Sequence, residues 1–454
     1  MSTKIARDQL HVMLKPGQRV FLSGASGAPQ PFLDNLYSDP ARSRELQLLT
    51  SYIPGVNLLD MERLHNSVRV SGPFIQPSFG NALRDGPLRA LAVSYGGFVS
   101  DLQTGPPIDL CVLQVSPPDA MGYCSLGPMV EFLPTVLSKS RRVLALINAR
   151  VPRIPGSFNI SLDDCDYLCE FDQALPSYSP ARDEISTSIA SLTATLIEND
   201  CTLQLGLGKL PTALYSALGG HQGLRLHSGM LSDGVMQLAA KGVLDHEFSP
   251  TACALLGSES FYTDAVQLPR LKLVGCATSH HPGVLHDLQH FTAVNSALEV
   301  DLFGQCNMEY ADGRAVSGVG GAPDFARAAR LCPYGRSIIT LGATCHNGEQ
   351  SRIVPCLSHG SVISVPRVDV EFIVTEYGVA DLRAASLHER AEAAVEIGGA
   401  KVTWAFAQHP GATVGYKVEV AGRKIAWVPD NEFLLGYMGP PTLARDHHCM
   451  RPCA

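Results

Sequence analysis

Charged residues are scarce in this sequence, and long apolar runs are missing from it. Only 17% of the 454 residues are Asp, Glu, Lys or Arg, and no segment approaches the roughly 20 apolar residues that span a bilayer. The net charge is −8, and no stripe of Lys and Arg with interleaved aromatic residues indicates nucleic-acid binding. We therefore expect a cytoplasmic protein with neither a membrane nor a nucleic acid as its partner.

Recognisable cysteine pairs are also missing. The 13 Cys are an odd number and stand singly, with no C-x-x-C pair and no Cys/His spacing that we recognise as typical of a metal site. His280 and His281 suggest a metal, but we find no carboxylate or Cys companion for them. The sequence therefore predicts reduced thiols, many of them buried, and no metal.

What the sequence does contain is a regular alternation of two periodicities. Apolar runs of strand length alternate with segments of helical period, such as 188–199 and 388–398, which is typical of parallel sheets covered by helices. The length favours two domains. We predict an α/β protein of two related domains with mainly parallel sheets. The strand-like runs are RVFL (19–22), LRALAV (88–93), DLCVLQVS (109–116), RRVLALINA (141–149), TLQLGLG (202–208), SIITLG (337–342), SVISV (361–365) and EFIVTEYG (371–378).

An internal similarity supports two domains of related topology. Residues 19–36 and 201–218 both read as strand, Gly-rich turn, Pro and helix, and aligning Pro29 with Pro211 sets Gly24 against Gly206. The second domain opens after the Pro-rich stretch ALPSYSPARDE, which gives domains of 1–184 and 185–454. Both turns offer backbone N–H groups for a phosphate or carboxylate, although neither matches a dinucleotide or P-loop motif.

The stretch LRLHSGMLSDGVMQL, residues 224–238, is the first candidate for an active site. It reads as a short strand, a polar corner and the start of a helix, and His227, Ser228, Ser232 and Asp233 crowd the corner around Gly229. The sequence alone leaves open which of these residues carries chemistry.

Three other segments have residues suited to binding. Gly318, Gly320 and Gly321 precede a helix at a density that permits close approach to a ligand or a moving loop. Glu376 follows an apolar strand, where open α/β sheets bind ligands. Asn295 can hydrogen-bond a thioester carbonyl.

Eight motifs, in this order, resemble the acetyl-CoA hydrolase/transferase family. These proteins are family I CoA-transferases, among them 4-hydroxybutyrate and butyryl-CoA:acetate CoA-transferases. The resemblance covers about residues 15–405, and the tail after 405 is outside it. The motifs are GASGAP (24–29), VSPPDAMGYCSLG (115–127), GLGKLP (206–211), HSGMLSDGV (227–235), VNSALEVDLFGQ (294–305), SGVGGAPDF (317–325), SRIVP (351–355) and VTEYGVADLR (374–383).

The resemblance implies a NagB/RpiA-like fold of two α/β domains with the active site between them. It implies acyl-CoA and a small carboxylate as substrates, no tightly bound cofactor, and leaves room for a homo-oligomer. The family's supporting acid and amide fall on Glu376 and Asn295. Its CoA-contacting turn falls on Gly206, Leu207, Gly208, Lys209 and Leu210. Its mobile glycine loop falls on Gly318, Val319, Gly320 and Gly321.

The resemblance fails at its central residue. Family members read H-T-E-M or H-S-E-M where this chain has His227, Ser228, Gly229 and Met230. That family glutamate attacks the acyl-CoA carbonyl to give a mixed anhydride and then a glutamyl-CoA thioester. Gly229 has no side chain with which to do so.

Three hypotheses remain open. Another carboxylate replaces the glutamate and CoA transfer continues, with Glu376, Glu299, Asp233 and Glu62 as candidates. Alternatively, water activated by Glu376 or His227 hydrolyses the acyl-CoA; attack by Ser228 is disfavoured because neighbouring strand residues point to opposite faces. In the third hypothesis the protein binds CoA or acyl-CoA without turning it over.

Overall fold

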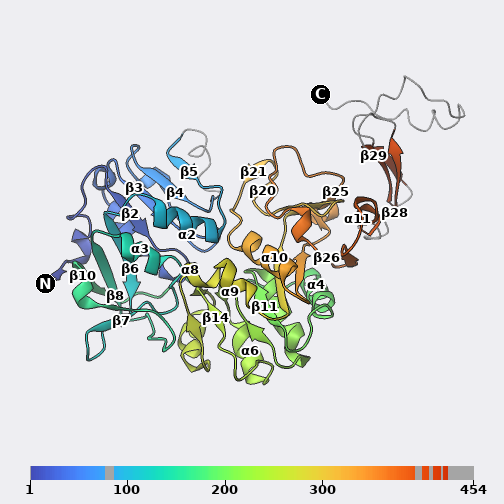
Figure 1. The fold of residues 1–454 in the computed structure, drawn as a ribbon. Helices are drawn as coiled ribbons and strands as arrows, with labels where there is room; N and C mark the ends of the chain where they lie inside the picture. Colours follow the sequence, from blue (N-terminus) through green and yellow to red (C-terminus); the bar gives the residue numbers. More distant parts are fainter. Residues whose placement is uncertain (1, 77–85, 394–400, 408–412, 421–422, 428–454) are drawn as a thin grey trace, which may run out of the picture.

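The chain folds around two large sheets, one in each half of the sequence (Figure 1). In a computed structural model, residues 2–76, 86–393, 401–407, 413–420 and 423–427 are described. The N-terminal half has an eight-stranded sheet whose neighbouring strands are all parallel. In spatial order its strands are β1 (Thr3–Lys4), β10 (Tyr167–Phe171), β8 (Val143–Asn148), β6 (Leu110–Val115), β2 (Arg19–Leu22), β3 (Gln47–Thr50), β4 (Arg69–Gly72) and β5 (Leu88–Ala90).

The C-terminal half has a six-stranded sheet, parallel except for its last pair. Its strands are β12 (Arg225–Leu226), β11 (Thr202–Leu205), β17 (Phe291–Ser296), β22 (Arg336–Thr340), β26 (Phe372–Thr375) and β27 (Gly378–Asp381). The predicted fold class, two α/β domains with mainly parallel sheets, is confirmed.

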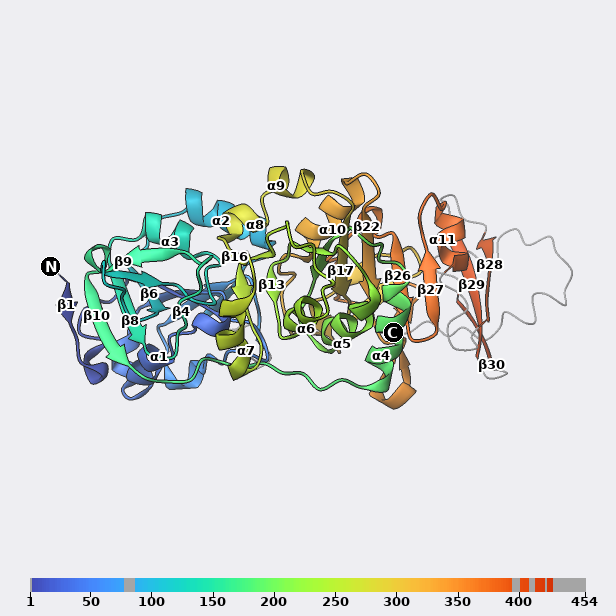
Figure 2. The ribbon, with the colours of Figure 1, turned by 90° about the horizontal axis from the view of Figure 1, so that it is seen from below.

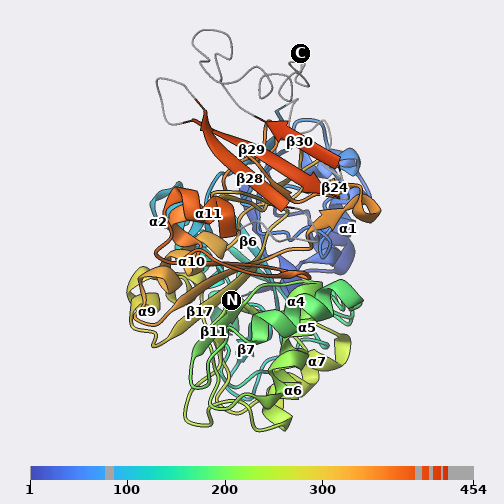
Figure 3. The ribbon, with the colours of Figure 1, turned by 90° about the vertical axis from the view of Figure 1, so that its right-hand side faces the viewer.

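Helices cover both faces of each sheet, because the central strands are apolar on both sides. In β2, Val20 and Leu22 pack with α1 (Gln30–Tyr37), and Phe21 packs with α2 (Tyr95–Thr104) and α3 (Leu133–Lys139). Burying each such side chain stabilises the fold by about 1.5–3 kcal/mol. In the C-terminal half, α10 (Ala322–Leu331) lies on one face, and α4 (Glu184–Ala194) and α5 (Lys209–Ala217) lie on the other (Figure 3).

Residues 172–183 connect the halves as an extended strap along the outside (Figure 2). Helix α4 begins where Asp183 and Ser186 form a capping box, in which each side chain bonds the other's backbone N–H. The domain boundary between 184 and 185 remains a prediction.

The C-terminal half also contains a series of short helices and strands. They are β13 (Met230–Leu231), α6 (Gly234–Ala240), β14 (Thr251–Ala252), β15 (Ala254–Leu255), α7 (Glu259–Asp264), β16 (Lys272–Leu273), α8 (Cys276–Ser279), α9 (Pro282–His286), β18 (Glu299–Asp301), β19 (Cys306–Asn307), β20 (Tyr310–Ala311), β21 (Arg314–Ala315), β23 (Thr344–Cys345), β24 (Gln350–Ser351) and β25 (Ile353–Val354). In the N-terminal half, β7 (Tyr123–Ser125) pairs with β9 (Asn159–Ser161).

One predicted strand is wrong. The run SVISV at 361–365 is no strand and makes only an isolated bridge between Cys306 and Val365. Val365 is buried in a core, whereas Val362 and Ile363 are exposed. Past α11 (Leu387–Ala393), the tail contains a three-stranded antiparallel sheet of β28 (Lys401–Ala407), β29 (Thr413–Val420) and β30 (Arg423–Trp427). Among the described residues, no helix has both the length and the apolar character needed to cross a membrane.

Candidate active site

The predicted site residues gather at one edge of the C-terminal sheet. Strands β11, β17 and β26 belong to one parallel set, so their carboxyl ends share an edge, and these ends lead into Gly206, Asn295 and Glu376. Helix α10 lies in the connection from the end of β17 to the start of β22. Its N-terminus and the preceding Gly321 therefore lie at the same edge. Ligands bind at this edge in open α/β sheets.

His227 and Ser228 do not form a catalytic pair. The buried His227 ring donates from Nε2 to the Ser279 carbonyl at 2.9 Å, and Ser228 Oγ donates to the Leu205 carbonyl at 2.8 Å. Burial lowers the pKa of His227, so its ring is held neutral. Each side chain therefore has a separate structural partner, which argues against Ser228 as a nucleophile with His227 as its base.

Gly229 is partly exposed, between these residues and β13. Its carbonyl accepts hydrogen bonds from Cys253 N at 3.1 Å, Ala254 N at 3.2 Å and Cys253 Sγ at 2.8 Å. A Cβ added to Gly229 would lie 3.4 Å from His280 Cε1 and Nε2 and 3.6 Å from Phe325. One additional carbon therefore fits in ordinary contact with its neighbours.

Three rings form an aromatic cluster opposite Gly229. The ring of His280 lies 5.2 Å from that of Tyr95 and 4.6 Å from that of Phe325, between centroids. Tyr95 comes from the N-terminal half, so this cluster joins the halves. Burial, the main cause, and nearby His227 lower the pKa of His280 to about 3.

The glycine loop 318–321 contacts the N-terminal half directly. A Cβ on Gly318 would lie 1.9 Å from the Pro73 carbonyl oxygen, and one on Gly321 would lie 2.3 Å from His280 Nε2. The Gly320 carbonyl accepts a 2.9 Å hydrogen bond from Tyr95 N. Close approach to protein therefore explains two of these glycines, without reference to a ligand.

The turn 206–210 has more room around it. Gly208 caps α5 with φ +126°, and a Cβ there would meet nothing within 4 Å. Lys209 is exposed and pairs with Asp183 at 3.1 Å. The related turn in the N-terminal half is buried, because Ser26 Oγ donates to the Leu255 carbonyl across the boundary between the halves. Of the two turns compared in the sequence, only the second is free to meet a ligand.

Asn295 and Glu376 are both held by hydrogen bonds. The buried Asn295 amide pairs reciprocally with that of Gln204, at 3.1 and 3.3 Å. Glu376 is half-buried and accepts a 2.8 Å hydrogen bond from Ala343 N. One carboxylate oxygen of Glu376 has no hydrogen bond among the described contacts.

The other carboxylates considered in the sequence have structural surroundings. Asp233 accepts from Ser258 N and Oγ, and Glu299 accepts from Ser358 N and Oγ. Glu62 is exposed on the short helix of residues 61–63 in the N-terminal half. These contacts argue against Asp233 and Glu299 as displaced nucleophiles.

Sequence reasoning missed Glu131, a fully buried carboxyl between the halves. It accepts from Ser51 Oγ at 2.5 Å and from Tyr95 Oη at 2.8 Å. Burial raises the pKa of Glu131 to about 7, although both hydrogen bonds act in the opposite direction. A single acid within the apolar run MVEFL (129–133) was the signal in the sequence.

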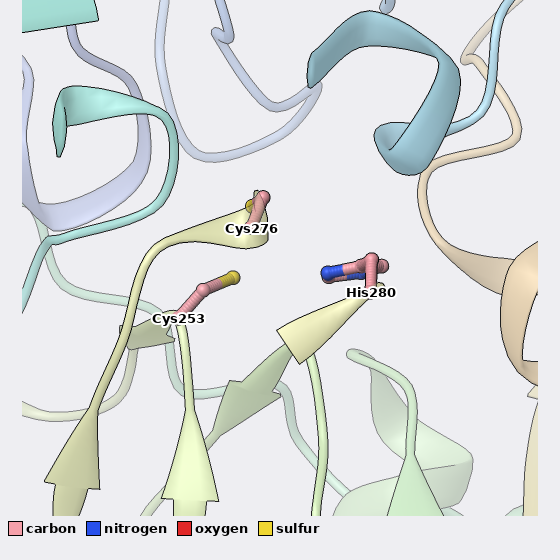
Figure 4. A group of neighbouring side chains, drawn as sticks. All are labelled: Cys253, Cys276 and His280. Atoms are coloured by element: carbon pink, nitrogen blue, oxygen red, sulfur yellow. The ribbon is translucent and has the colours of Figure 1, made fainter. Parts of the chain in front are cut away.

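A second missed feature is a cluster of metal-ligand residues, Cys253, Cys276 and His280. Their ligand atoms all lie within 4.8 Å of one another, and all three residues are buried. Figure 4 shows Cys253 sulfur and a His280 nitrogen directed toward each other. Cys276 and His280 are four residues apart, on one turn of α8 and its C-cap, a Cys–His relationship that the spacing between cysteines does not reveal.

Two cavities lined by described residues lie away from Gly229. One of about 380 Å³ in the C-terminal half is lined by Glu299, His346 and Arg352, among others. Another of about 300 Å³ lies beside α1 and Gln114. Gly229 lines neither cavity, since His280 and Phe325 stand against it.

Two family models match this chain. Residues 88–177 match the acetyl-CoA hydrolase/transferase N-terminal domain, and residues 257–405 match the C-terminal domain of the same family. Both matches lie within the range over which the sequence motifs resemble that family.

Individual proteins agree with these matches. The chain is 34% identical over 298 residues to 4-hydroxybutyrate coenzyme A transferase of Clostridium kluyveri, covering 64% of this chain and 70% of that protein. It is 31% identical to succinyl-CoA:cyclohexane-1-carboxylate CoA transferase of Geobacter metallireducens, covering 63% and 67%. The crystal structure of 4-hydroxybutyrate CoA-transferase from Porphyromonas gingivalis superposes with a TM-score of 0.70 at 27% identity, over 86% of this chain and 92% of that one.

Proposed function

Because this chain belongs to the acetyl-CoA hydrolase/transferase family, we propose that it moves CoA between a short-chain acyl-CoA and a small carboxylate such as acetate. The observation that carries the proposal is the position of Gly229. It is partly exposed and stands beside the glycine loop and the contact between the halves. A thioester carbonyl bound there would contact the backbone of Gly229 and the imidazole of His280, where the family has its glutamate.

The proposed roles follow from the surroundings of each residue. The turn Gly206–Leu210 receives the coenzyme, which the open space around Gly208 and the exposed ammonium of Lys209 support. The loop 318–321 closes the site toward the N-terminal half. Glu376, which has one carboxylate oxygen without a hydrogen bond among the described residues, orients the acid or a water, and Asn295 supports the strand end through Gln204.

Transfer without a protein nucleophile requires the acceptor itself to attack. An acetate oxygen adds to the acyl-CoA carbonyl carbon, the C–S bond breaks, and a mixed anhydride and CoA thiolate remain bound. The thiolate then attacks the acetyl carbonyl, the anhydride C–O bond breaks, and acetyl-CoA and the other carboxylate leave. Both acids and CoA must be bound together, so the kinetics are sequential, unlike the ping-pong kinetics of an enzyme that forms a covalent intermediate.

Hydrolysis is the alternative that Gly229 itself favours. The missing side chain leaves a place for water, which Glu376 can activate as a base. Binding of acyl-CoA without turnover is the third candidate. The hydrogen bonds that Glu131 and Glu376 already accept from protein groups favour it.

One assay separates these functions. Acyl-CoA is incubated with the full chain, with and without acetate, and free CoA and acetyl-CoA are both followed. Acetyl-CoA formed only with acetate supports transfer, and free CoA formed without acetate supports hydrolysis. Binding with neither product supports the third function.

Four further expectations belong to this proposal. CoA is a substrate, and the carboxyl exchange itself needs no tightly bound organic cofactor. A homo-oligomer and a cytoplasmic location also remain proposals.

A further inference from the structure

We propose that Cys253, Cys276 and His280 bind a thiophilic divalent cation, with Zn²⁺ as the best match, where the two halves meet. The three side chains are buried, and their ligand atoms are at most 4.8 Å apart (Figure 4). Three atoms at that spacing lie within about 2.8 Å of a common centre, compared with zinc–ligand distances of about 2.0–2.3 Å. A contraction of about half an ångström would complete the coordination.

The backbone already fixes two of the ligands relative to each other. His280 N donates to the Cys276 carbonyl at 3.0 Å, so these residues lie one helical turn apart on the same side of α8. Residues at this spacing on a helix are neighbours. Two ligands from one helical turn need little rearrangement to accept an ion.

The third ligand comes from a rigid connection between β14 and β15. Cys253 N donates to the Gly229 carbonyl at 3.1 Å, and the Cys253 carbonyl accepts from Glu131 N at 2.9 Å. When Cys253 Sγ ligates a metal it stops donating to Gly229, whose carbonyl keeps the N–H donors of Cys253 and Ala254. The change therefore leaves no backbone group unpaired.

The donor set selects the ion. Two sulfurs and one imidazole suit zinc and other thiophilic metals and do not suit Mg²⁺ or Ca²⁺, which prefer oxygen. Two thiols lose their protons to solvent as the cation binds, so two thiolates and one divalent cation leave no net charge. A neutral imidazole at His280 donates a lone pair to the ion.

Among the described residues the cluster has no fourth protein ligand, and Gly229 lies against the His280 ring. A substrate carbonyl at Gly229, as in the proposed function, would therefore lie beside the ion. Metal binding itself does not depend on that function, and it is measured without acyl-CoA.

The test titrates the metal-free full chain with Zn²⁺ against a chromogenic chelator, with a phosphine reductant to keep thiols reduced. We expect one Zn²⁺ per chain, two protons released per ion, and thiolate-to-metal charge-transfer absorption when Co²⁺ is used. Cys253→Ser and Cys276→Ser should each weaken the affinity about 100-fold or more. Cys306→Ser, at another buried cysteine outside the cluster, should bind as the parent does.

A second readout needs no variant. Bound Zn²⁺ should protect Cys253 and Cys276 from alkylation in mild denaturant, as measured by mass spectrometry of the peptides. Absence of stoichiometric binding by the parent chain overturns the proposal, and so does Zn²⁺ affinity that persists in both serine variants. If binding is found and the acyl-CoA assay gives no product, the metal site stands and the proposed function fails.

Discussion

Asp324 at the start of α10 accepts a 2.7 Å hydrogen bond from Ser94 Oγ, at the N-cap of α2. Its second carboxylate oxygen accepts a 3.0 Å hydrogen bond from Gly96 N. These bonds join the N-terminal ends of two helices from different halves, and the negative charge is favourable at both ends. Because α10 follows the glycine loop, the same contact holds that loop near Gly229.

Asp324→Ala should loosen this contact. Two hydrogen bonds to a carboxylate are lost, and Gly96 N in the first turn of α2 loses its acceptor, which we expect to reduce the free energy of unfolding by about 1–3 kcal/mol. Hydrogen exchange should accelerate in α2 and at the start of α10. Asp381→Ala, which breaks an exposed ion pair with Arg383, is the control and should leave both helices unchanged. Equal exchange in the parent and Asp324→Ala would show that the contact contributes little.

Gly321→Ala should destabilise the protein more than an ordinary glycine replacement. The new methyl would lie 2.3 Å from His280 Nε2 and 2.9 Å from Phe325, both within the packed aromatic cluster. Overpacking of this kind costs about 1–3 kcal/mol, measurable by denaturant unfolding. Gly220→Ala is the matched control, because a Cβ there meets nothing within 4 Å. Equal stability of the two variants would contradict the close packing around Gly321.

The parts of the fold that follow from local periodicity were predictable. The predicted run 109–116 contains β6 (Leu110–Val115), and RVFL coincides with β2, because strands buried on both faces are continuously apolar. Glu376 was predicted to follow an apolar strand and lies directly after β26. The strand predicted at 361–365 is wrong because only Val365 is buried, where it bridges Cys306, while Val362 and Ile363 are exposed. A short apolar run does not reveal this difference.

The contents of the site were harder to predict, since they depend on contacts between distant segments. Glu131 meets Ser51 from 80 positions away, and Cys253 meets Cys276 only after β14 and β16 pair. Likewise, the corner at 227–229 gave no sign that Ser228 would donate to Leu205. Such partners are set by tertiary packing, which one sequence does not reveal.

Glu131→Gln should remove a pH dependence of stability. The pKa of Glu131 is about 7 in the folded protein, above its ordinary value of 4.5, so the folded state prefers the protonated form. Its stabilising contribution is complete below pH 4.5 and is lost as the pH rises through 7, a change of roughly 3 kcal/mol. Urea unfolding at pH 5 and pH 8 measures this change.

The comparison is between pH profiles, since other buried acids titrate in the parent and in the variant alike. Glu131→Gln should lose less stability between pH 5 and pH 8 than the parent does. Glu62→Gln, at an exposed position, should keep the parent's profile. Parallel profiles for the parent and Glu131→Gln would contradict the raised pKa.

Lys209→Gln tests the proposed coenzyme turn. If the Lys209 ammonium meets CoA phosphate, its removal should raise KM for acyl-CoA about three- to tenfold with kcat nearly unchanged, because binding is lost equally in ground and transition states. Stability should change by less than about 1 kcal/mol, since the ion pair with Asp183 is exposed. Asp183→Asn, which removes the ion pair and retains an N-cap side chain, should leave KM unchanged or lower it. An unchanged KM in Lys209→Gln would exclude a phosphate contact for this residue.

Gly229→Glu restores the residue that the family resemblance implies. The first side-chain carbon fits, at 3.4 Å from His280, and Gly229 does not have the positive φ that would strain a larger residue. A carboxylate beside the bound thioester should raise exchange about tenfold or more and change sequential kinetics to ping-pong kinetics. Incubation with acyl-CoA alone should then give a covalent CoA adduct on the peptide containing residue 229. Gly229→Gln, equal in size but not nucleophilic, should form no adduct. If Gly229→Glu folds normally and forms none either, the thioester carbonyl does not bind beside position 229, and the proposed location of the active site is wrong.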